Sequence, residues 1–132
     1  MRILNAERTL LLEDIASNTS ILLSYRLPTT DERVQYSAGL WKKIGNEVTS
    51  CHAEVRAKFG LQILTGIRDG DFGTVHDSEV VPLSGNPGSE HYDQNWKDII
   101  SLQAEDVLIM LGKFAFEDAL KISPQNGQAA GN

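Results

Sequence analysis

The junction at residues 25–33 constrains the fold of this chain more than any other segment. An apolar run ends there at Pro28, which has no amide hydrogen to give to a sheet and disfavours helix at the residue before it. Thr29 and Glu32 follow with the Thr-x-x-Glu spacing of a capping box, in which each residue bonds to the backbone of the other at the start of a helix. One element therefore ends before Pro28, and a helix begins directly after Thr29.

The residues before this junction fit either a β-hairpin or a short helix. The polar segment 18–20 separates two apolar runs, and the second run, 21–27, has the apolar and polar alternation of a strand. The alternative is a helix over residues 5–17, in which Leu11 and Ile15 lie one turn apart. The alternation favours the hairpin. Because an isolated hairpin is only marginally stable in water, we expect it to lie on the helices or to pair with another copy.

Residues 30–59 carry an apolar stripe with helical spacing. The stripe consists of Val34, Trp41, Ile44, Val48, Cys51, Val55 and Phe59. Steps of three, four and seven residues predict one long helix, although glycines at three positions weaken it by about 1 kcal/mol each relative to alanine. The stripe could continue through Ile63 and Ile67 as far as residues 68–73, whose Arg-Asp-Gly-Asp-Phe-Gly sequence breaks any helix.

The second half of the chain begins with a segment that is rich in turn residues. Residues 74–93 predict a long loop that is mobile unless a partner orders it, with one possible strand at 79–83. Helical spacing returns near residue 95, shows a break between 101 and 106, and ends near Ile122, ahead of a polar tail. The predicted fold is α+β, with an N-terminal β-hairpin, a mainly helical body and a long central loop. It forms a single domain over residues 1–122, followed by a disordered tail at 123–132.

Composition limits the class of protein to which the chain can belong. A chain of 132 residues is long enough for one domain with a real core, and its net charge of -6 makes it a poor ligand for nucleic acid. No apolar stretch reaches the roughly 20 residues of a membrane span, and the first residues lack the pattern of a signal peptide. The single cysteine, Cys51, excludes an intrachain disulfide. We therefore expect a cytoplasmic protein that binds neither membrane nor nucleic acid.

The residues with chemical potential form no recognised catalytic or metal motif. Asp69 and Asp71 match only the first two ligands of an EF-hand loop, and a helix-ending turn explains them better. His76, Asp77, His91 and Asp93 flank the predicted loop without the spacing of a zinc site. Cys51 and His52 are adjacent, and adjacent residues on a helix do not face each other. The sequence therefore predicts no catalytic residue, no cofactor and no metal.

Large aromatic residues are the best candidates for contacts with other proteins. Trp is over-represented at the centre of protein interfaces, although burial of both tryptophans in the core is the commoner outcome. Phe114 and Phe116 would face different sides of a helix, so we expect at least one of them to lie outside the core. The candidate interaction residues are Tyr25, Trp41, Trp96, Phe114 and Phe116.

The order of these segments resembles a known family. An Arg-Thr-Leu-Leu-Leu run at 8–12 leads to Tyr-Arg-Leu-Pro-Thr-Thr-Asp-Glu-Arg at 25–33, and Ala-Lys-Phe-Gly-Leu-Gln-Ile-Leu-Thr-Gly follows at 57–66. Arg-Asp-Gly-Asp-Phe at 68–72 and a helix that begins with Trp96-Lys97 complete the pattern. The chain resembles the small acidic proteins encoded among the tail genes of tailed bacteriophages and prophages, and is similar in size and layout to their tail assembly chaperones.

This resemblance implies a non-enzymatic role in the host cytoplasm. Such chaperones coat the tape-measure protein, help to recruit tail-tube subunits and often self-associate; some are also made in a longer, frameshifted form. The contacts would come from the hairpin at 10–27, the stripe at 41–59 and the last helix. One alternative is a structural completion or connector protein that stays in the virion. An alternative of another class is a small enzyme or metal-binding protein that uses Asp69, Asp71, His76, Asp77 or His91.

Overall fold

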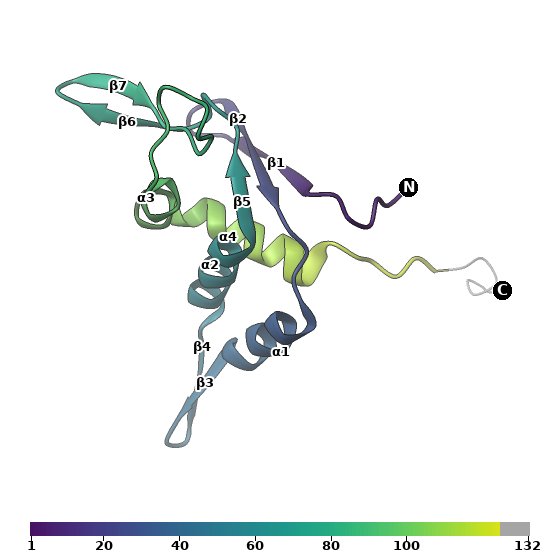
Figure 1. Cartoon of the computed structure of the whole chain (residues 1–132). Coiled ribbons are helices and arrows are strands. Elements are labelled where there is room, and N and C mark those ends of the chain that lie inside the picture. Colours follow the sequence, from purple (N-terminus) through teal and green to yellow (C-terminus); the bar gives the residue numbers. More distant parts are fainter. Residues whose placement is uncertain (125–132) are drawn as a thin grey trace.

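The computed structural model describes residues 1–124 and shows an α+β fold, as the sequence predicts (Figure 1). The elements in chain order are β1 (Arg8–Asp14), β2 (Thr19–Tyr25), α1 (Thr30–Gly39), β3 (Trp41–Ile44), β4 (Glu47–Ser50), α2 (His52–Ile63), β5 (Leu64–Ile67), β6 (Gly73–His76), β7 (Glu79–Pro82), α3 (Trp96–Gln103), α4 (Glu105–Lys113) and the π-helical turn η1 (Phe114–Asp118). Among residues 1–124, no helix combines the length and the apolar character needed to cross a bilayer.

The N-terminal hairpin is confirmed, and it gains a third strand from its own chain. β1 pairs with β2 from Arg8 opposite Tyr25 to Asp14 opposite Thr19, and β2 pairs on its other side with β5. The alternate residues Ile21, Leu23 and Tyr25 of β2 are buried against the helices. The expectation that the stripe continues helically through Ile67 is wrong, because the chain leaves α2 at Leu64 in extended conformation and enters the sheet.

The capping box at the start of α1 is also confirmed. The Thr29 hydroxyl accepts the Glu32 amide at 3.2 Å, and the Thr29 amide donates to the Glu32 carboxylate at 2.9 Å. That carboxylate is buried, and it also accepts two bonds from Arg26, at 2.7 and 2.8 Å, and one from Gln62 at 2.7 Å. The Arg26 hydrogen bonds are the main reason that the pKa of Glu32 falls from 4.5 to about 2. The box thus joins β2, α1 and α2.

Two glycines let α2 and α4 cross with their backbones in contact. A Cβ atom at Gly60 would lie 2.2 Å from the carbonyl oxygen of Leu108, and one at Gly112 would lie 2.1 Å from the carbonyl oxygen of Arg56. Around this crossing lie the fully buried side chains of Ile63, Leu108 and Leu111. Gly60 therefore has a packing role, because any residue with a Cβ atom would clash at the crossing.

The prediction of one helix over residues 30–59 is wrong. The structure divides this segment into α1, a two-stranded hairpin and α2. The hairpin turns through Gly45 and Asn46, and Gly45 has a φ of +61°, as in the two-residue turns that need glycine first. Trp41, Ile44 and Val48 therefore lie on strands, and the spacing that indicated a helix is coincidental.

The segment expected to be a single loop, 74–93, begins with a second hairpin. β6 and β7 pair from Gly73 opposite Pro82 to His76 opposite Glu79, which confirms the possible strand at 79–83. The remaining residues form a loop, held by a bond from the Ser84 amide to the His91 carbonyl and one from the Asp93 amide to the Ser84 carbonyl. The long loop is therefore shorter than expected, and its mobility stays a prediction.

The C-terminal helices follow the expected break but end early. Ala104 leaves helical geometry at φ -137° and separates α3 from α4. The last helical residue is Asp118 in η1, not Ile122. Of the predicted disordered tail at 123–132, Ser123 and Pro124 form neither helix nor strand, and the residues from 125 on lie outside the described part of the chain.

Replacing Gly112 with alanine tests the helix crossing. The added Cβ would meet the Arg56 backbone, which cannot move aside as a flexible side chain can. We expect Gly112→Ala to lower the free energy of unfolding by about 3 kcal/mol, the upper end of the usual cost of overpacking, measured by urea denaturation. Gly88→Ala is the matched control, since its Cβ would meet only Asn86, at 3.5 Å, and it should change stability by less than about 0.5 kcal/mol.

The pKa of Glu32 predicts an acid-sensitive part of the stability. Because this pKa is about 2 when folded and 4.5 ordinarily, the carboxylate contributes stability that is fully present above pH 4.5 and is lost as the pH falls through about 2. Glu32→Gln should be less stable than the wild type at neutral pH, and urea denaturation should show this difference shrinking across that window. Glu90→Gln, at a side chain that is 87% exposed, is the control. A constant difference for Glu32→Gln would contradict the prediction.

Candidate protein-interaction surface

A hairpin that projects from the helices is the main candidate surface. We call residues 41–50, which comprise β3, β4 and their turn, the arm. All eight strand residues of the arm are exposed. Figure 1 shows the arm leaving the body between α1 and α2 and extending away from both sheets and helices. A two-stranded hairpin with no face against a core is marginally stable alone, so the arm has unused packing surface on both sides.

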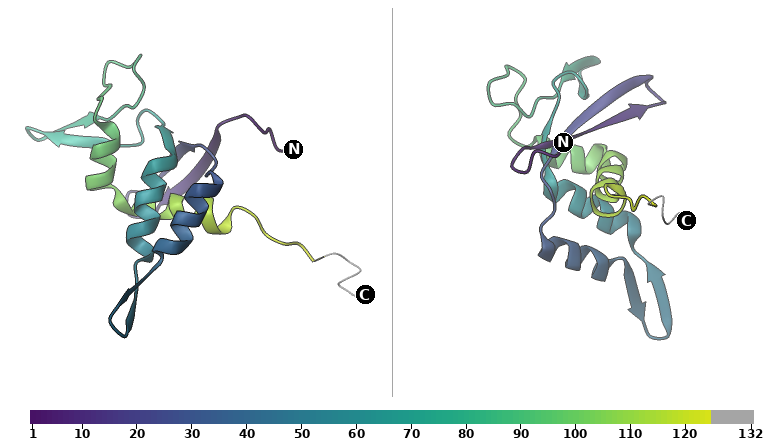
Figure 2. Two further views of the ribbon diagram at one scale, coloured as in Figure 1. Left: turned by 60° about the horizontal axis from the view of Figure 1, so that its bottom comes forward. Right: turned by 90° about the vertical axis from the view of Figure 1, so that its right-hand side faces the viewer.

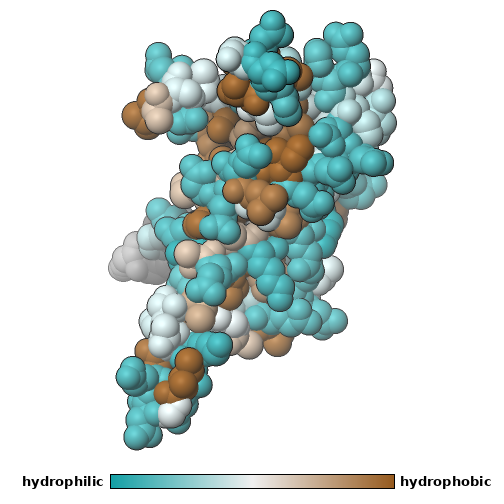
Figure 3. All heavy atoms as spheres, turned by 90° about the vertical axis from the view of Figure 1, so that its left-hand side faces the viewer, coloured by the Kyte–Doolittle hydropathy of each residue, from teal (hydrophilic) through white to brown (hydrophobic). Residues whose placement is uncertain are grey.

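The arm carries both apolar and basic side chains. Its exposed apolar residues are Trp41, at 57% exposed, and Ile44 and Val48, both at 62%. The strand register places Trp41, Lys43 and Val48 on one face and Lys42 and Ile44 on the other. Figure 3 shows this mixture as brown atoms among teal ones on the projecting arm. Each face therefore offers an apolar contact beside a positive charge.

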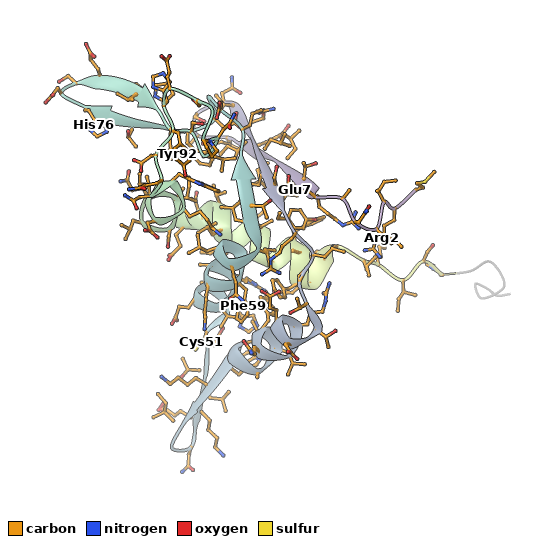
Figure 4. The ribbon with its side chains drawn as sticks, viewed as in Figure 1. Arg2, Glu7, Cys51, Phe59, His76 and Tyr92 are labelled. Carbon is orange, nitrogen blue, oxygen red and sulfur yellow. The ribbon has the colours of Figure 1, made fainter. Side chains whose placement is uncertain are left out.

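The base of the arm is held in place by the start of α2. The Cys51 amide donates to the Leu40 carbonyl at 2.8 Å, and the Trp41 ring meets the edge of the His52 ring at a centroid distance of 4.9 Å. The Ser50 hydroxyl and His52 Nδ1 are 2.6 Å apart. Figure 4 labels Cys51 where the arm joins α2. His52 thus holds the base of the arm in place. The Cys51 thiol lies near the Thr49 carbonyl and forms no catalytic pair with the His52 ring.

The β6–β7 hairpin is a second projecting element. Val75 and Val80 are directly opposite each other in its register and are 71% and 74% exposed. Its turn places Asp77 and Ser78 at φ values of 51° and 68°, which suit a tight two-residue turn at some strain for residues with a side chain. This hairpin lacks the paired lysines of the arm.

The structure separates the five predicted contact residues. Trp41 is exposed on the arm, whereas Tyr25 and Trp96 are 3% and 8% exposed and belong to the core. Phe114 and Phe116 are both partly buried against that core, so the expectation that one of them lies outside it is wrong. Both residues lie in the π-helical turn η1, and each packs against the core. Of the five residues, Trp41 is therefore the one that is exposed to a binding partner.

Phe116 has a structural role in an aromatic and charged cluster. Its ring stacks on Tyr36 at 4.4 Å and meets the edge of Phe59 at 5.5 Å. The Tyr36 hydroxyl donates to Glu117, which also accepts two bonds from Arg56, at 2.8 and 2.9 Å. Burial raises the pKa of Tyr36, and the hydrogen bond from Arg56 lowers the pKa of Glu117. This cluster ties α1 and α2 to the end of α4.

The predicted chemical residues are engaged in the fold or lie apart. Asp71 accepts the Leu22 amide at 2.8 Å and pairs with Arg68, while Asp69 accepts the Ser84 hydroxyl at 2.6 Å. His76 and His91 line a shallow hollow of about 400 Å³ between β6 and α3, and Figure 4 shows His76 on the hairpin. Within residues 1–124, no three His, Cys, Asp or Glu side chains gather as metal ligands would.

The sequence contained a signal for the arm that the helical spacing concealed. Gly45 and Asn46 form a two-residue turn between the segments 41–44 and 47–50, a pattern typical of hairpins. Other exposed apolar residues, among them Val75, Val80 and Met110, were not singled out from the sequence. Their exposure follows from tertiary packing, which a local pattern does not encode.

The comparisons with known proteins identify no relative. No family model, no curated protein and no solved structure matches the chain.

Tryptophan fluorescence can test the exposure of the arm. Trp41 is 57% exposed and Trp96 is 8% exposed, so acrylamide should quench Trp41 far more strongly. We expect Trp41→Phe to remove most of the quenchable emission, and Trp96→Phe, where the fold tolerates it, to remove the protected part. Equal quenching of the two single-tryptophan variants would contradict a projecting arm.

Proposed function

We propose that this chain is a phage or prophage tail-morphogenesis protein, acting as a tail assembly chaperone in the host cytoplasm. In this proposal it is not an enzyme, it binds tape-measure and tail-tube proteins, and it self-associates. The support is the sequence pattern at residues 8–12, 25–33 and 57–72, together with a surface suited to binding another protein.

The observation that carries the proposal is the arm. Three large apolar side chains, those of Trp41, Ile44 and Val48, are held in water on an element that contacts the body only at its base. Exposed apolar groups ringed by polar ones are typical of interaction sites, and a partner strand or helix could bury them. The favourable free energy of that burial is about 25 cal/mol for each Å² of apolar surface removed from water.

The acidic residues favour a binding role over a catalytic one. The buried carboxylate of Glu32 and the partly buried ones of Asp71 and Glu117 are each paired with an arginine. Groups satisfied in this way stabilise the fold and have no free lone pairs directed at a substrate. The exposed apolar side chains of the projecting hairpins, by contrast, have no partner in the core of the described residues.

Co-purification with candidate partners tests the proposal. The chain would be co-expressed with the tape-measure and tail-tube proteins of the same phage, and we expect it to retain at least one of them. Ile44→Ser with Val48→Ser should weaken retention, because it removes apolar contacts without touching the core. Val75→Ser with Val80→Ser is the matched control on the other hairpin and should retain the partner.

Two outcomes would count against the proposal. Binding to neither protein would overturn the chaperone role. If only the control variant loses the partner, the binding surface lies on β6–β7 and not on the arm. Stoichiometric amounts of the chain in mature virions, measured by mass spectrometry, would favour the structural completion or connector role. A bound metal found by elemental analysis would favour the metal-binding alternative.

A further inference from the structure

A hollow lies between the tip of the β1–β2 hairpin and α4. We call it the tip hollow. It has a volume of about 170 Å³, and its floor is formed by the apolar side chains of Leu12, Ile21 and Val107. Ile15, which is 84% exposed, and Met110, which is 52% exposed, stand at its edges. The hollow therefore has an apolar floor, and two of the apolar side chains at its edge are largely exposed.

The rim of the tip hollow is acidic. Glu13 and Asp14 border it from the hairpin, and Asp106 borders it from the first turn of α4. A second hollow of about 290 Å³ continues around the hairpin tip and shares Glu13, Asp14 and Ile15 with the first. None of the described residues that line either hollow carries a positive charge. An occupant should therefore be apolar and basic.

The arm has this chemistry. Residues 41–50 hold Lys42 and Lys43 against a single acid, Glu47, so the arm is positive in a chain whose net charge is -6. Ile44 and Val48 stand beside the lysines and are both 62% exposed. The charge and the apolar content of the arm thus both complement the tip hollow.

An arm cannot reach the hollow of its own molecule. The right-hand view of Figure 2 shows the β1–β2 tip and the arm at opposite ends of the molecule, with the helices between them. Any contact between the two surfaces must therefore join two copies. We infer that the arm of one copy docks in the tip hollow of the next, between the hairpin tip and α4. Lys42 and Lys43, on opposite faces of the arm, then face the acidic residues on the two sides of the hollow, Glu13 and Asp106.

This contact is head-to-tail. Each copy presents one arm and one hollow, so the interaction repeats and produces a ring or an open helical chain instead of a closed two-fold dimer. An arm of ten residues is smaller than the 20–30 residues per side of a standard interface. Each contact should therefore be weak, and raising the salt from about 0.1 M to about 1 M, which shortens the Debye length from about 10 to about 3 Å, should weaken it further.

The inference rests on the self-association in the proposed function and names the surfaces that produce it. Its test uses charge reversal. The arm variant is Lys42→Glu with Lys43→Glu, and the hollow variant is Glu13→Lys with Asp106→Lys. Asp14 is left intact, because its carboxylate bonds to the Ala16 and Ser17 amides in the turn. Sedimentation velocity over a concentration series measures association, and circular dichroism checks that each variant is folded.

We expect the wild type to form oligomers larger than dimers at low salt. Each variant alone should associate about tenfold more weakly or worse, because like charges then face each other. The equimolar mixture should recover wild-type association, since each arm again meets a hollow of opposite charge. If a charge variant is unfolded, Ile44→Ser on the exposed arm should show the same loss, and Val80→Ser should show none.

Three results would overturn the inference. If both variants associate as strongly as the wild type, the chain self-associates, but through another interface. A mixture that stays as weak as its components would exclude direct pairing of arm and hollow. A wild type that is monomeric at millimolar concentration would overturn both the interface and the proposed self-association, while binding to tape-measure or tail-tube protein is measured separately.

Discussion

The close crossing of α2 and α4 is the constraint on which the rest of the structure depends. Gly60 and Gly112 let the two backbones touch. A Cβ atom added at either position would lie about 2 Å from a carbonyl oxygen of the other helix. This contact brings Ile63, Leu108 and Leu111 together in a layer that the three-stranded sheet covers. The sheet in turn depends on the end of α2, because β5 follows it without a loop. Wider spacing at the crossing would open the core and displace the third strand.

Two buried or half-buried carboxylates fix the remaining elements around this crossing. Glu32 joins the start of α1 to Arg26 and to Gln62 on α2, and Glu117 joins the end of the last helix to Arg56 and Tyr36. Both pKa values are lowered by the hydrogen bonds from arginine. A carboxylate with this many donors is costly to protonate or to replace. The acidic composition therefore serves partly to position α1, and not only to charge the surface.

Local chemistry explains which parts of the fold the sequence could predict. The capping box needs only Thr29 and Glu32, and the hairpin needs only a polar turn between alternating strands, so both were visible in the sequence. The helix predicted over 30–59 failed because three-and-four spacing also occurs by chance in a β-rich segment, where the turn at Gly45 decides the outcome. The third strand, the wide turn at Phe114–Asp118 and the burial of Tyr25 and Trp96 all depend on contacts distant in sequence.

The candidate site follows from the same failure. Trp41, Ile44 and Val48 have the spacing of a helical stripe, and the structure instead places them on strands that the core does not reach. The arm contacts the body only near its base, so its apolar residues stay in water beside two lysines. A chain of net charge -6 that keeps a positive, apolar arm at one end and an acid-rimmed hollow at the other has the elements of a polar, repeating contact. The residues whose helical state was wrongly predicted are thus the ones best placed to bind another chain.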